Sequence, residues 1–378
     1  MSGVYNVHFI SVPAYLPSQV DTRLSNELFT PQSPPKPPSH APSFLPAALR
    51  KMSQLHSSLH HVAQREWSEP HFHPSQLVYP LFVTSRHEDR AIKGLEPNMQ
   101  WGQQADGSFS TLVAHLAHLQ TLGLRSIMLF GVVEDKDAHG SLADDPNTPV
   151  IKCTQVVRAQ LPELLVSCDV CMCEYTDHGH CGLLRAVDGE DIIENASTVD
   201  RLARIALAYA RAGAHMVCPS DMMDNRIQGI RTALNAEGFQ HVSIMAYTSK
   251  KASCMYAPFR DAVESTFKGD RKRYQHPVGS TSHAALAFER DVREGADIVI
   301  VKPALFYADI VARFAANKSV PVACYVVSGE FKMLTDYGNS TGSLEAVVRE
   351  AHLSLLRAGS SVLITYFAPF ILERWTKW

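Results

Sequence analysis

A short segment of this chain concentrates residues that can hold a metal ion. Residues 168–182 read CDVCMCEYTDHGHCG and contain four of the chain's eight cysteines, together with two histidines. Cys171 and Cys173 alternate, so in a strand both side chains face the same side, and Cys181 follows eight residues later, beyond a turn at Gly179. Zinc prefers soft sulfur ligands in tetrahedral geometry. The spacing therefore predicts a zinc ion on Cys171, Cys173 and Cys181.

The same segment leaves two other interpretations open. A structural zinc would take His178 or His180 as its fourth ligand, and the thiols could also be buried without a metal. Three thiolates with an open fourth position are typical of a catalytic zinc, which is the interpretation we favour. The period of a strand turns Cys168 to the opposite face. We therefore expect the remaining cysteines to be core residues, namely Cys153, Cys168, Cys218, Cys254 and Cys324.

Two lysines end apolar segments and could act as nucleophiles. Lys250 ends VSIMAYTSK and Lys302 ends DIVIVK. Burial disfavours the ammonium form and lowers the pKa of a lysine, and a second lysine nearby lowers it further. A neutral amine forms a Schiff base with a carbonyl substrate. A single lysine at such a place is commonly a solvated cation, but two together predict carbonyl activation through one or two imines beside a Lewis-acidic metal.

Alternation along residues 242–250 distinguishes Lys250 from its neighbour Lys251. Because successive side chains of a strand point to opposite faces, the two lysines cannot both enter one site. We expect Lys250 to face inward with the small or branched residues of its parity, and Lys251 to face outward, toward the helices. The predicted inward set is Val242, Ile244, Ala246, Thr248 and Lys250, with Ile298, Ile300 and Lys302 in the next strand.

These residues need a frame that brings the ends of strands together. Eight apolar, β-branched runs alternate with amphipathic segments, as is typical of parallel strands buried on both faces. Eight strand–helix units predict a closed (β/α)8 TIM barrel, an α/β fold whose active site lies at the carboxyl ends of the strands. A doubly wound open sheet is the alternative, but no glycine-rich nucleotide fingerprint follows the first run. The runs are 77–83, 126–132, 164–172, 215–220, 242–250, 297–304, 321–329 and 361–369.

The polar residues that end these runs should converge on one rim of the barrel. Such side chains are costly in a barrel interior unless they are used. Besides the thiols and lysines, they are Asp169, Ser220, Asp221, Ser328 and Tyr366.

Local signals also place one connecting helix and one long loop. In residues 197–213, Ser197 and Asp200 predict a capping box and Gly213 the end of the helix. Residues 256–280 are long and basic for a barrel loop and predict a lid, although an ordinary solvated loop is the alternative. Its arginines could bind a substrate carboxylate in a bidentate manner. They are Arg260, Arg271 and Arg273.

Composition limits the classes of partner and compartment. The 378 residues carry a net charge of −3 without a long basic run, which argues against nucleic acid. No run reaches the roughly 18 apolar residues of a membrane helix, and no basic region precedes an apolar signal segment. We therefore expect a cytoplasmic protein whose thiols are reduced. Residues 1–50, rich in proline and serine, predict a disordered or loosely docked arm, and residues 51–378 the catalytic barrel.

Taken together, these motifs resemble the porphobilinogen synthase family, also called 5-aminolevulinate dehydratases, in its zinc-dependent type. The resemblance runs from about residue 51 to the C-terminus and implies a (β/α)8 barrel. It also implies a homo-octamer in which the N-terminal arm embraces a neighbouring subunit. The matching stretches are YPLFVT, CDVCMCEYTDHGHCG, PSDMMDNRI, YAPFRDA, GDRKRYQ, REGADIVIVKP, YVVSGEF and ITYFAP.

The resemblance implies an activity and a role for each matched residue. The family joins two 5-aminolevulinate molecules into porphobilinogen, with loss of two waters, for haem and other tetrapyrroles. Lys302 would form the imine with the first substrate, and Lys250 would hold the second. Other matches are lid residues Arg260, Arg271 and Gln275; carboxylate-binding Ser328 and Tyr366; second-site residues Asp169 and Ser220; and zinc ligands Cys171, Cys173 and Cys181. A non-catalytic relative, or a Schiff-base enzyme with another substrate, is the rival interpretation.

Overall fold

The computed structural model describes residues 56–267 and 269–377. The chain divides into two compact units, Met1–His61 and Val62–Trp378. Of the first unit, the described part is 56–61, which contains the short 3-10 helix His56–Leu59. The predicted arm, residues 1–50, lies outside the described residues and stays a prediction.

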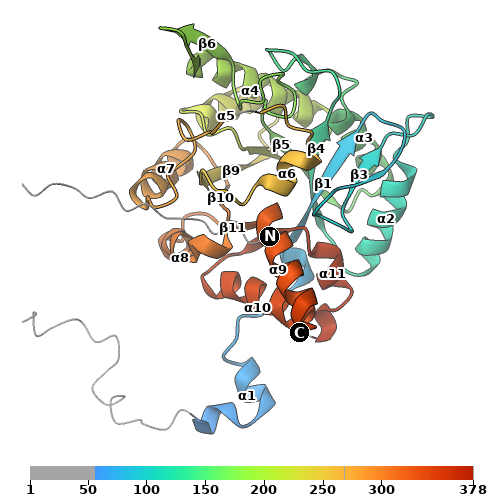
Figure 1. Cartoon of the computed structure of the whole chain (residues 1–378), viewed down its shortest axis with the longest axis vertical. Helices are drawn as coiled ribbons and strands as arrows, with labels where there is room; N and C mark the ends of the chain where they lie inside the picture. Colours follow the sequence, from blue (N-terminus) through green and yellow to red (C-terminus); the bar gives the residue numbers. More distant parts are fainter. Residues whose placement is uncertain (1–55, 268, 378) are drawn as a thin grey trace, which may run out of the picture. The chain divides into compact units, whose positions relative to one another are not determined.

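The second unit is a closed barrel of eight parallel strands, with helices around the outside (Figure 1). Each strand pairs with the next around the barrel, and β12 pairs with β1 through Leu77–Leu363 and Val78–Ile364, which closes it. The predicted fold and all eight predicted strands are confirmed. The strands are β1 (Leu77–Thr84), β4 (Ser126–Val132), β5 (Leu165–Val170), β8 (Met216–Pro219), β9 (Ser243–Lys250), β10 (Ile298–Lys302), β11 (Val322–Val326) and β12 (Val362–Thr365).

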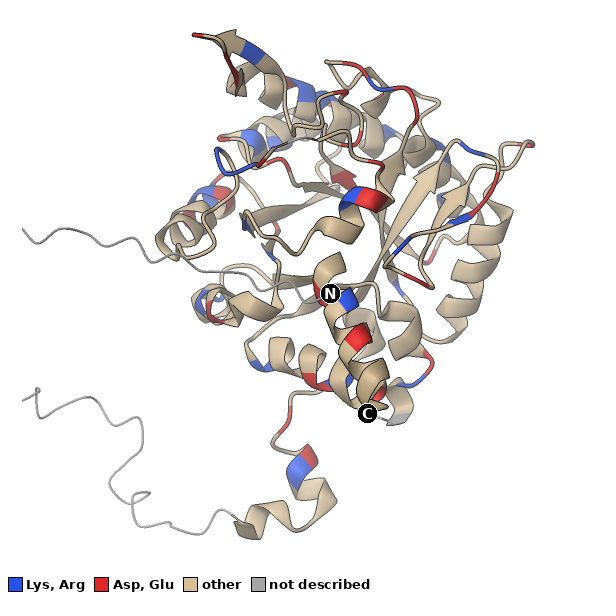
Figure 2. Cartoon of the chain, viewed as in Figure 1, with Lys and Arg blue, Asp and Glu red and all other residues tan. Residues whose placement is uncertain are grey.

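Helices connect successive strands, and shorter elements decorate the loops. The connecting helices are α2 (Ser110–Thr121), α3 (Pro149–Gln160), α4 (Asn195–Arg211), α5 (Arg226–Ala236), α7 (Ser282–Arg293), α8 (Ala308–Asn317), α9 (Ser328–Thr341) and α10 (Leu344–Arg357). The additions are α1 (Val62–Glu66), α6 (Ala257–Ala262), α11 (Ala368–Leu372), β2 (Arg90–Ala91), β3 (Met99–Gly102) and the hairpin β6 (Leu184–Val187) with β7 (Glu190–Ile193). Figure 2 shows acidic and basic residues interspersed over the helices and outer loops.

The ends of α4 show where local sequence signals succeed and fail. Gly213 follows the helix at φ +101°, a conformation that glycine adopts without strain, as predicted. The start was predicted wrongly. The N-cap is Glu194, whose carboxylate accepts a hydrogen bond from the backbone N–H of Ser197 at 2.9 Å, so Ser197 lies inside the helix. Glutamate rarely caps a helix, and the serine was the more conventional candidate.

A bulge interrupts β9 and changes which of its side chains face inward. Val299 of β10 pairs with Ala246, but Val301 pairs with Ser249, so β9 contains one extra residue between these pairs. An extra residue breaks the strict alternation of a strand. The Tyr247 ring lies 6.3 Å from that of Tyr325 in the barrel, although Tyr247 was predicted to face the helices. Tyr247 therefore departs from the predicted alternation on the near side of the bulge, whereas Lys250, beyond it, lines the cavity.

Candidate functional site

Lys250 and Lys302 lie side by side at the carboxyl ends of β9 and β10, where they are register partners. Each side chain belongs to a residue that is only 5% exposed. Both line an enclosed cavity beneath the lid, together with Cys173 and Ser220. A larger hollow, lined partly by the β6–β7 hairpin and α7, contains no lysine or cysteine. The chemistry-bearing residues therefore gather at the smaller, more enclosed cavity.

The amine of Lys302 sits among aromatic rings. Its Nζ lies 4.1 Å from the ring centre of Tyr325, and 5.0 Å from those of Tyr247 and Phe259. Burial, and secondly the positive charge of Lys250, lower the pKa of Lys302 to about 7. The lowered pKa expected for a buried lysine with a like neighbour is thus confirmed at Lys302, whose amine is available in its neutral form near pH 7.

Lys250 has a different environment. Its Nζ donates a hydrogen bond to the backbone carbonyl of Ser220 at the end of β8. Burial lowers the pKa of Lys250, but the negative charge of the nearby sulfur cluster, that of Cys181 first, outweighs it, so that the pKa is raised. The expectation of a lowered pKa is therefore wrong for this lysine, because the sequence does not show how close the thiols come.

Three buried thiols form a compact cluster beside the lysines. The sulfurs of Cys171, Cys173 and Cys181 all lie within 4.8 Å of one another, and those of Cys171 and Cys173 are 3.4 Å apart. A tetrahedral ion with zinc–sulfur bonds of 2.3 Å separates its sulfurs by about 3.8 Å. Hydrogen bonds from Cys171 and Cys173 hold the pKa of Cys181 well below its usual value. The donor set and spacing therefore fit a thiophilic cation such as zinc.

The two histidines of the segment are occupied elsewhere. His178 Nε2 lies 3.4 Å from the carbonyl of Ala138, and His180 Nδ1 lies 3.1 Å from the hydroxyl of Tyr274. Within residues 56–267 and 269–377, neither joins the three sulfurs in a group of metal-ligand spacing. This arrangement favours an open fourth position over a closed structural site.

The other cysteines fall mostly where they were expected. Four are completely buried in the core, namely Cys153, Cys168, Cys218 and Cys324. Cys254 was predicted to be a core residue, and this is wrong: it is exposed. The physical reason is that β9 ends at Lys250, so Cys254 belongs to the loop that follows and not to a strand.

Two polar residues lie near the lysines, Asp169 in β5 and Ser220 directly after β8. The hydroxyl of Ser220 donates a hydrogen bond to Asp169 at 2.9 Å. Burial, and secondly the charge of Glu174, raise the pKa of Asp169 to about 7. Glu174 is 3% exposed, lines the cavity and accepts a contact from the Cys173 thiol at 3.4 Å. Sequence reasoning missed Glu174 because it follows Cys173 directly, where a continued strand would turn it away, but β5 ends at Val170.

The segment after β9 covers the cavity with α6 and the chain beyond it. Arg260, Arg271 and Gln275 all line the cavity. Arg271 donates to the carbonyl of Gly179 at 2.9 Å, which ties the lid to the thiol loop. Arg273, also predicted as a carboxylate binder, does not reach the site. It forms an exposed ion pair with Glu190 of β7 at 2.7 Å.

Ser328 and Tyr366 lie beside the cavity at the ends of β11 and β12. The hydroxyl of Ser328 accepts a hydrogen bond from the backbone N–H of Phe259 in α6, at 3.0 Å. The hydroxyl of Tyr366 lies 3.0 Å from that of Tyr325, whose ring faces Lys302. Sequence reasoning missed the aromatic lining, because such rings within apolar strands and next to them resemble ordinary core. Besides Tyr325, it comprises Phe130, Tyr247, Tyr256 and Phe259.

Lys251 points away from the cavity, as predicted. Its ammonium donates to the carbonyl of Ser280 and lies 5.5 Å from the ring centre of Tyr307. The residue is fully buried nonetheless. The structure thus separates two adjacent buried lysines into one that lines the cavity and one that packs behind it.

A closed (β/α)8 barrel with two buried lysines and three clustered thiols at its carboxyl rim has its polar groups where enzymes of this fold have their active sites. Comparison with known proteins makes the assignment specific. The sequence model of the delta-aminolevulinic acid dehydratase family matches residues 52–374. The chain belongs to this family of enzymes of porphyrin biosynthesis.

Individual relatives agree over nearly their whole length. The bovine delta-aminolevulinic acid dehydratase is 44% identical over 86% of this chain and 98% of its own. That of the archaeon Methanothermobacter thermautotrophicus is 42% identical over 80% of this chain and 91% of its own. The crystal structure of the Toxoplasma gondii enzyme, in complex with its product porphobilinogen, superposes with a TM-score of 0.80. It is 32% identical and covers 85% of this chain and 91% of its own.

Within the described residues, no helix is long and apolar enough to cross a membrane.

Proposed function

We propose that the chain is a porphobilinogen synthase that condenses two molecules of 5-aminolevulinate through lysine imines beside a zinc ion. The observation that carries the proposal is the pair of buried lysines, Lys250 and Lys302, in one cavity with the thiol of Cys173. Family membership supports the reaction, and the relative crystallised with porphobilinogen supports the product.

Lys302 is the residue that we assign to the first imine. With its pKa lowered to about 7, about half of its amine is neutral at pH 7, compared with fewer than about one in a thousand for an ordinary lysine. The neutral amine adds to the ketone carbon of 5-aminolevulinate, and loss of one water leaves the imine. The surrounding aromatic rings exclude water, which otherwise hydrolyses an imine.

The second substrate is assigned to Lys250 and the lid. Lys250 lies next to Lys302, so a substrate on the amine of Lys302 and one held by the Lys250 side chain are adjacent, as bond formation between them requires. Asp169 and Ser220 face the same space and can exchange the protons that the condensation moves. For the substrate carboxylates we assign two groups, Arg260, Arg271 and Gln275 from the lid and Ser328 and Tyr366 from the rim.

The three thiols are assigned to zinc. Cys171, Cys173 and Cys181 would hold the ion, and Cys173 also lines the cavity of the two lysines. When bound there, zinc supplies a Lewis acid that polarises an oxygen of the substrate. The chain's own contribution is to hold the three sulfurs together and to place Arg271 and Lys250 near their negative charge.

Two further assignments concern the setting of the enzyme. We propose a cytoplasmic location, which is supported by eight free cysteines, all within the described residues. We also propose a homo-octamer assembled through the N-terminal arm, on the basis of the family resemblance.

A colour assay for pyrrole formation tests the function. The purified chain with zinc and 5-aminolevulinate should form a pyrrole, and borohydride added during turnover should leave a covalent adduct found by mass spectrometry. Pyrrole formation excludes a non-catalytic scaffold. An adduct without pyrrole would instead identify a Schiff-base enzyme for another carbonyl substrate. The absence of both the adduct and the pyrrole would refute the proposal outright.

A further inference from the structure

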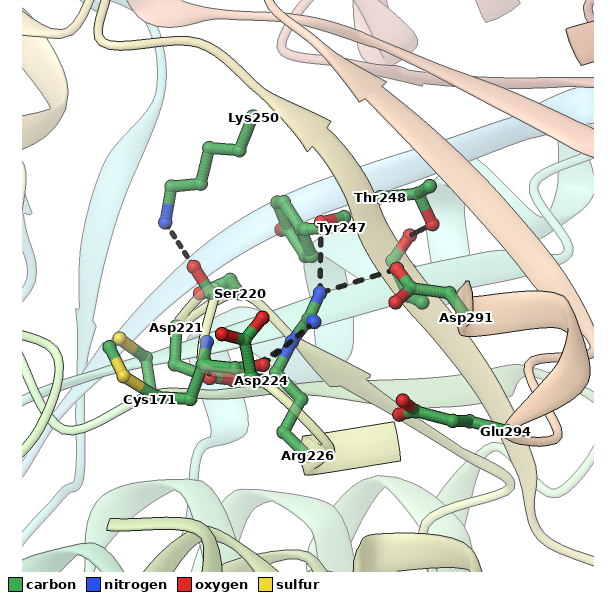
Figure 3. Close-up of polar contacts among 12 residues, drawn as sticks. Cys171, Ser220, Asp221, Asp224, Arg226, Tyr247, Thr248, Lys250, Asp291 and Glu294 are labelled. Carbon is green, nitrogen blue, oxygen red and sulfur yellow. Dashed lines mark hydrogen bonds and ion pairs between the residues drawn. The ribbon is translucent and has the colours of Figure 1, made fainter. Parts of the chain in front are cut away.

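A completely buried arginine lies behind the proposed active site. Arg226 begins α5 and is 0% exposed, as are the two carboxylates nearest to it, Asp221 and Asp291 (Figure 3). Asp291, which belongs to α7, also accepts a hydrogen bond from Arg290 at 2.9 Å, so that two positive and two negative charges alternate here. Arg226, Asp221 and Asp291 are not among the residues that line the cavity of the two lysines, and the proposed mechanism does not use them.

The geometry around Arg226 points to the backbone as its main partner. Its ion pairs are long, with Nε 3.5 Å from Asp221 and Nη2 3.5 Å from Asp291, and neither of these approaches is a hydrogen bond. Its shorter contacts, at 3.1 Å, are hydrogen bonds to two backbone carbonyls, those of Met223 and Tyr247. A planar guanidinium can donate in several fixed directions at once, so one side chain can hold two segments in fixed relation.

The carbonyl of Tyr247 belongs to the bulge of β9. Tyr247 lies in the stretch where β9 has one residue more than β10, and Lys250 is three residues further on. A bulge leaves its extra residue outside the ladder of strand hydrogen bonds and redirects the side chains that follow it. Arg226 therefore holds β9 at its bulge, and the bulge determines whether the side chain of Lys250 faces the cavity.

The carbonyl of Met223 belongs to the turn that contacts the ammonium of Lys250. Met223 closes a turn in which the carboxylate of Asp221 accepts the N–H of Met223 at 2.7 Å, and Met222 has the unusual φ of +77°. Ser220, whose carbonyl accepts the ammonium of Lys250, begins this turn. Figure 3 shows the Lys250 ammonium on the carbonyl of Ser220, and the Arg226 guanidinium between Tyr247 and Asp291.

We propose that Arg226, held between Asp221 and Asp291, is a positioning residue that fixes the base and the tip of Lys250 together. It sets the strand bulge from which the lysine side chain starts and the turn whose carbonyl holds its ammonium. The proposal rests on the assignment of Lys250 to the second substrate. It predicts that loss of Arg226 disturbs Lys250 while Lys302, which starts from β10, keeps its place.

The chain offers a matched control for the experiment. Arg231, in the same helix, holds the residue directly before β9, through the Val242 carbonyl at 3.1 Å, and also pairs with a carboxylate, that of Asp297 at 2.5 Å. It does so at the opposite end of the strand, away from the cavity. Arg226→Lys and Arg231→Lys keep the positive charge and remove the several N–H donors of the guanidinium. The two variants therefore differ in which end of β9 loses its arginine hydrogen bond.

We expect Arg226→Lys to lose on the order of 10- to 100-fold in kcat/KM, with a raised KM, because misplacement of a reacting group by about 1 Å has effects of this size. The borohydride adduct on Lys302 should keep the wild-type stoichiometry. Arg231→Lys should stay within a few-fold of wild type, at a comparable loss of melting temperature. Equal losses of activity in both variants, or loss of the Lys302 adduct together with activity, would overturn the proposal.

A second variant and a substrate-free measurement cover the remaining outcomes. If Arg226→Lys does not fold, Asp291→Asn keeps the shape of the side chain and removes its charge opposite both Arg226 and Arg290. It should show the same pattern more weakly, and wild-type kinetics there would count against the proposal. Acetylation of the two lysines, followed by mass spectrometry, reads the geometry without 5-aminolevulinate. A changed Lys250 to Lys302 labelling ratio in Arg226→Lys alone is expected. This ratio decides about Arg226 even if the wild-type chain forms no pyrrole.

Discussion

Three buried lysines within one barrel rim provide a direct test of the residue assignments. Lys302→Met should lose roughly 10³-fold or more of activity, because the covalent route disappears. Lys250→Met should also be severely impaired, whereas Lys251→Met should stay within a few-fold of wild type, since its ammonium faces Ser280 behind the site. Pyrrole assays on folded variants, with adduct mapping, provide the measurement. An adduct on Lys251, or an inactive but folded Lys251→Met, would contradict the assignment.

The environment of Lys302 predicts a pH dependence with a definite sign. Its pKa is lowered to about 7, by burial first and by Lys250 second, so the reactive neutral amine is lost as the pH falls through about 7. Trapping of the Lys302 imine by cyanoborohydride should therefore increase with pH and level off above about pH 8. Lys250→Met removes one positive neighbour, which should raise the pKa of Lys302 and move the limb to higher pH. A limb that moved to lower pH would contradict this electrostatic coupling.

At the scale of single residues, the sequence predicted identities better than surroundings. Spacing was enough to bring Cys171, Cys173 and Cys181 together, and position at a strand end was enough for both lysines. Lys250 was nevertheless predicted to face inward by an alternation that the bulge at Tyr247 breaks. Neither the bulge nor the hydrogen bond that Arg226 donates to it can be seen in the hydrophobic pattern. From sequence alone an arginine is expected to be exposed, so the burial of Arg226 could not be predicted.

At the scale of elements, the loop that follows β5 provides a metal prediction. A strong chelator should remove zinc and abolish pyrrole formation, and Cys173→Ala should do the same. The barrel should survive, because its strands pair and pack without the loop. Zinc content by atomic absorption, activity, and the far-ultraviolet circular dichroism spectrum are the measurements. Full activity of Cys173→Ala without metal, or unfolding on chelation, would each contradict this interpretation of the cluster.

The same scale shows which elements a sequence can predict. Continuous apolar runs identified every barrel strand, since a strand buried on both faces has little choice of residue. Runs that extended beyond the strands, such as 164–172 against Leu165–Val170, did so because the rim residues stay apolar or buried after the ladder ends. The long loop after β9 was predicted as a cover, but not that Arg273 would turn to the β6–β7 hairpin. Such a choice depends on a long-range partner, Glu190, which local pattern does not contain.

At the scale of the whole molecule, the barrel and the arm have different support. The family match begins at residue 52, so the arm assigned to residues 1–50 rests on its own composition and not on the matched region. We predict that removal of residues 1–35 leaves the barrel folded, because the segment FTPQSPPKPPSHAPSFLP and its surroundings lack the apolar periodicity of a core element. The melting temperature of the truncated chain should stay close to that of the full chain, as measured by circular dichroism.

The size of the assembly then distinguishes a segment that bridges subunits from one that takes no part in assembly. Light scattering of the full and truncated chains should show smaller particles after truncation if the arm bridges subunits, with the subunits still folded. Unchanged size with unchanged folding would remove these residues from the assembly and contradict the octamer assigned through them. Unfolding of the truncated subunit would contradict the division of the chain itself, since a segment without core periodicity would then be contributing to the barrel core. Activity per folded subunit shows in addition whether the site, whose described residues all come from one chain, needs a neighbour to work.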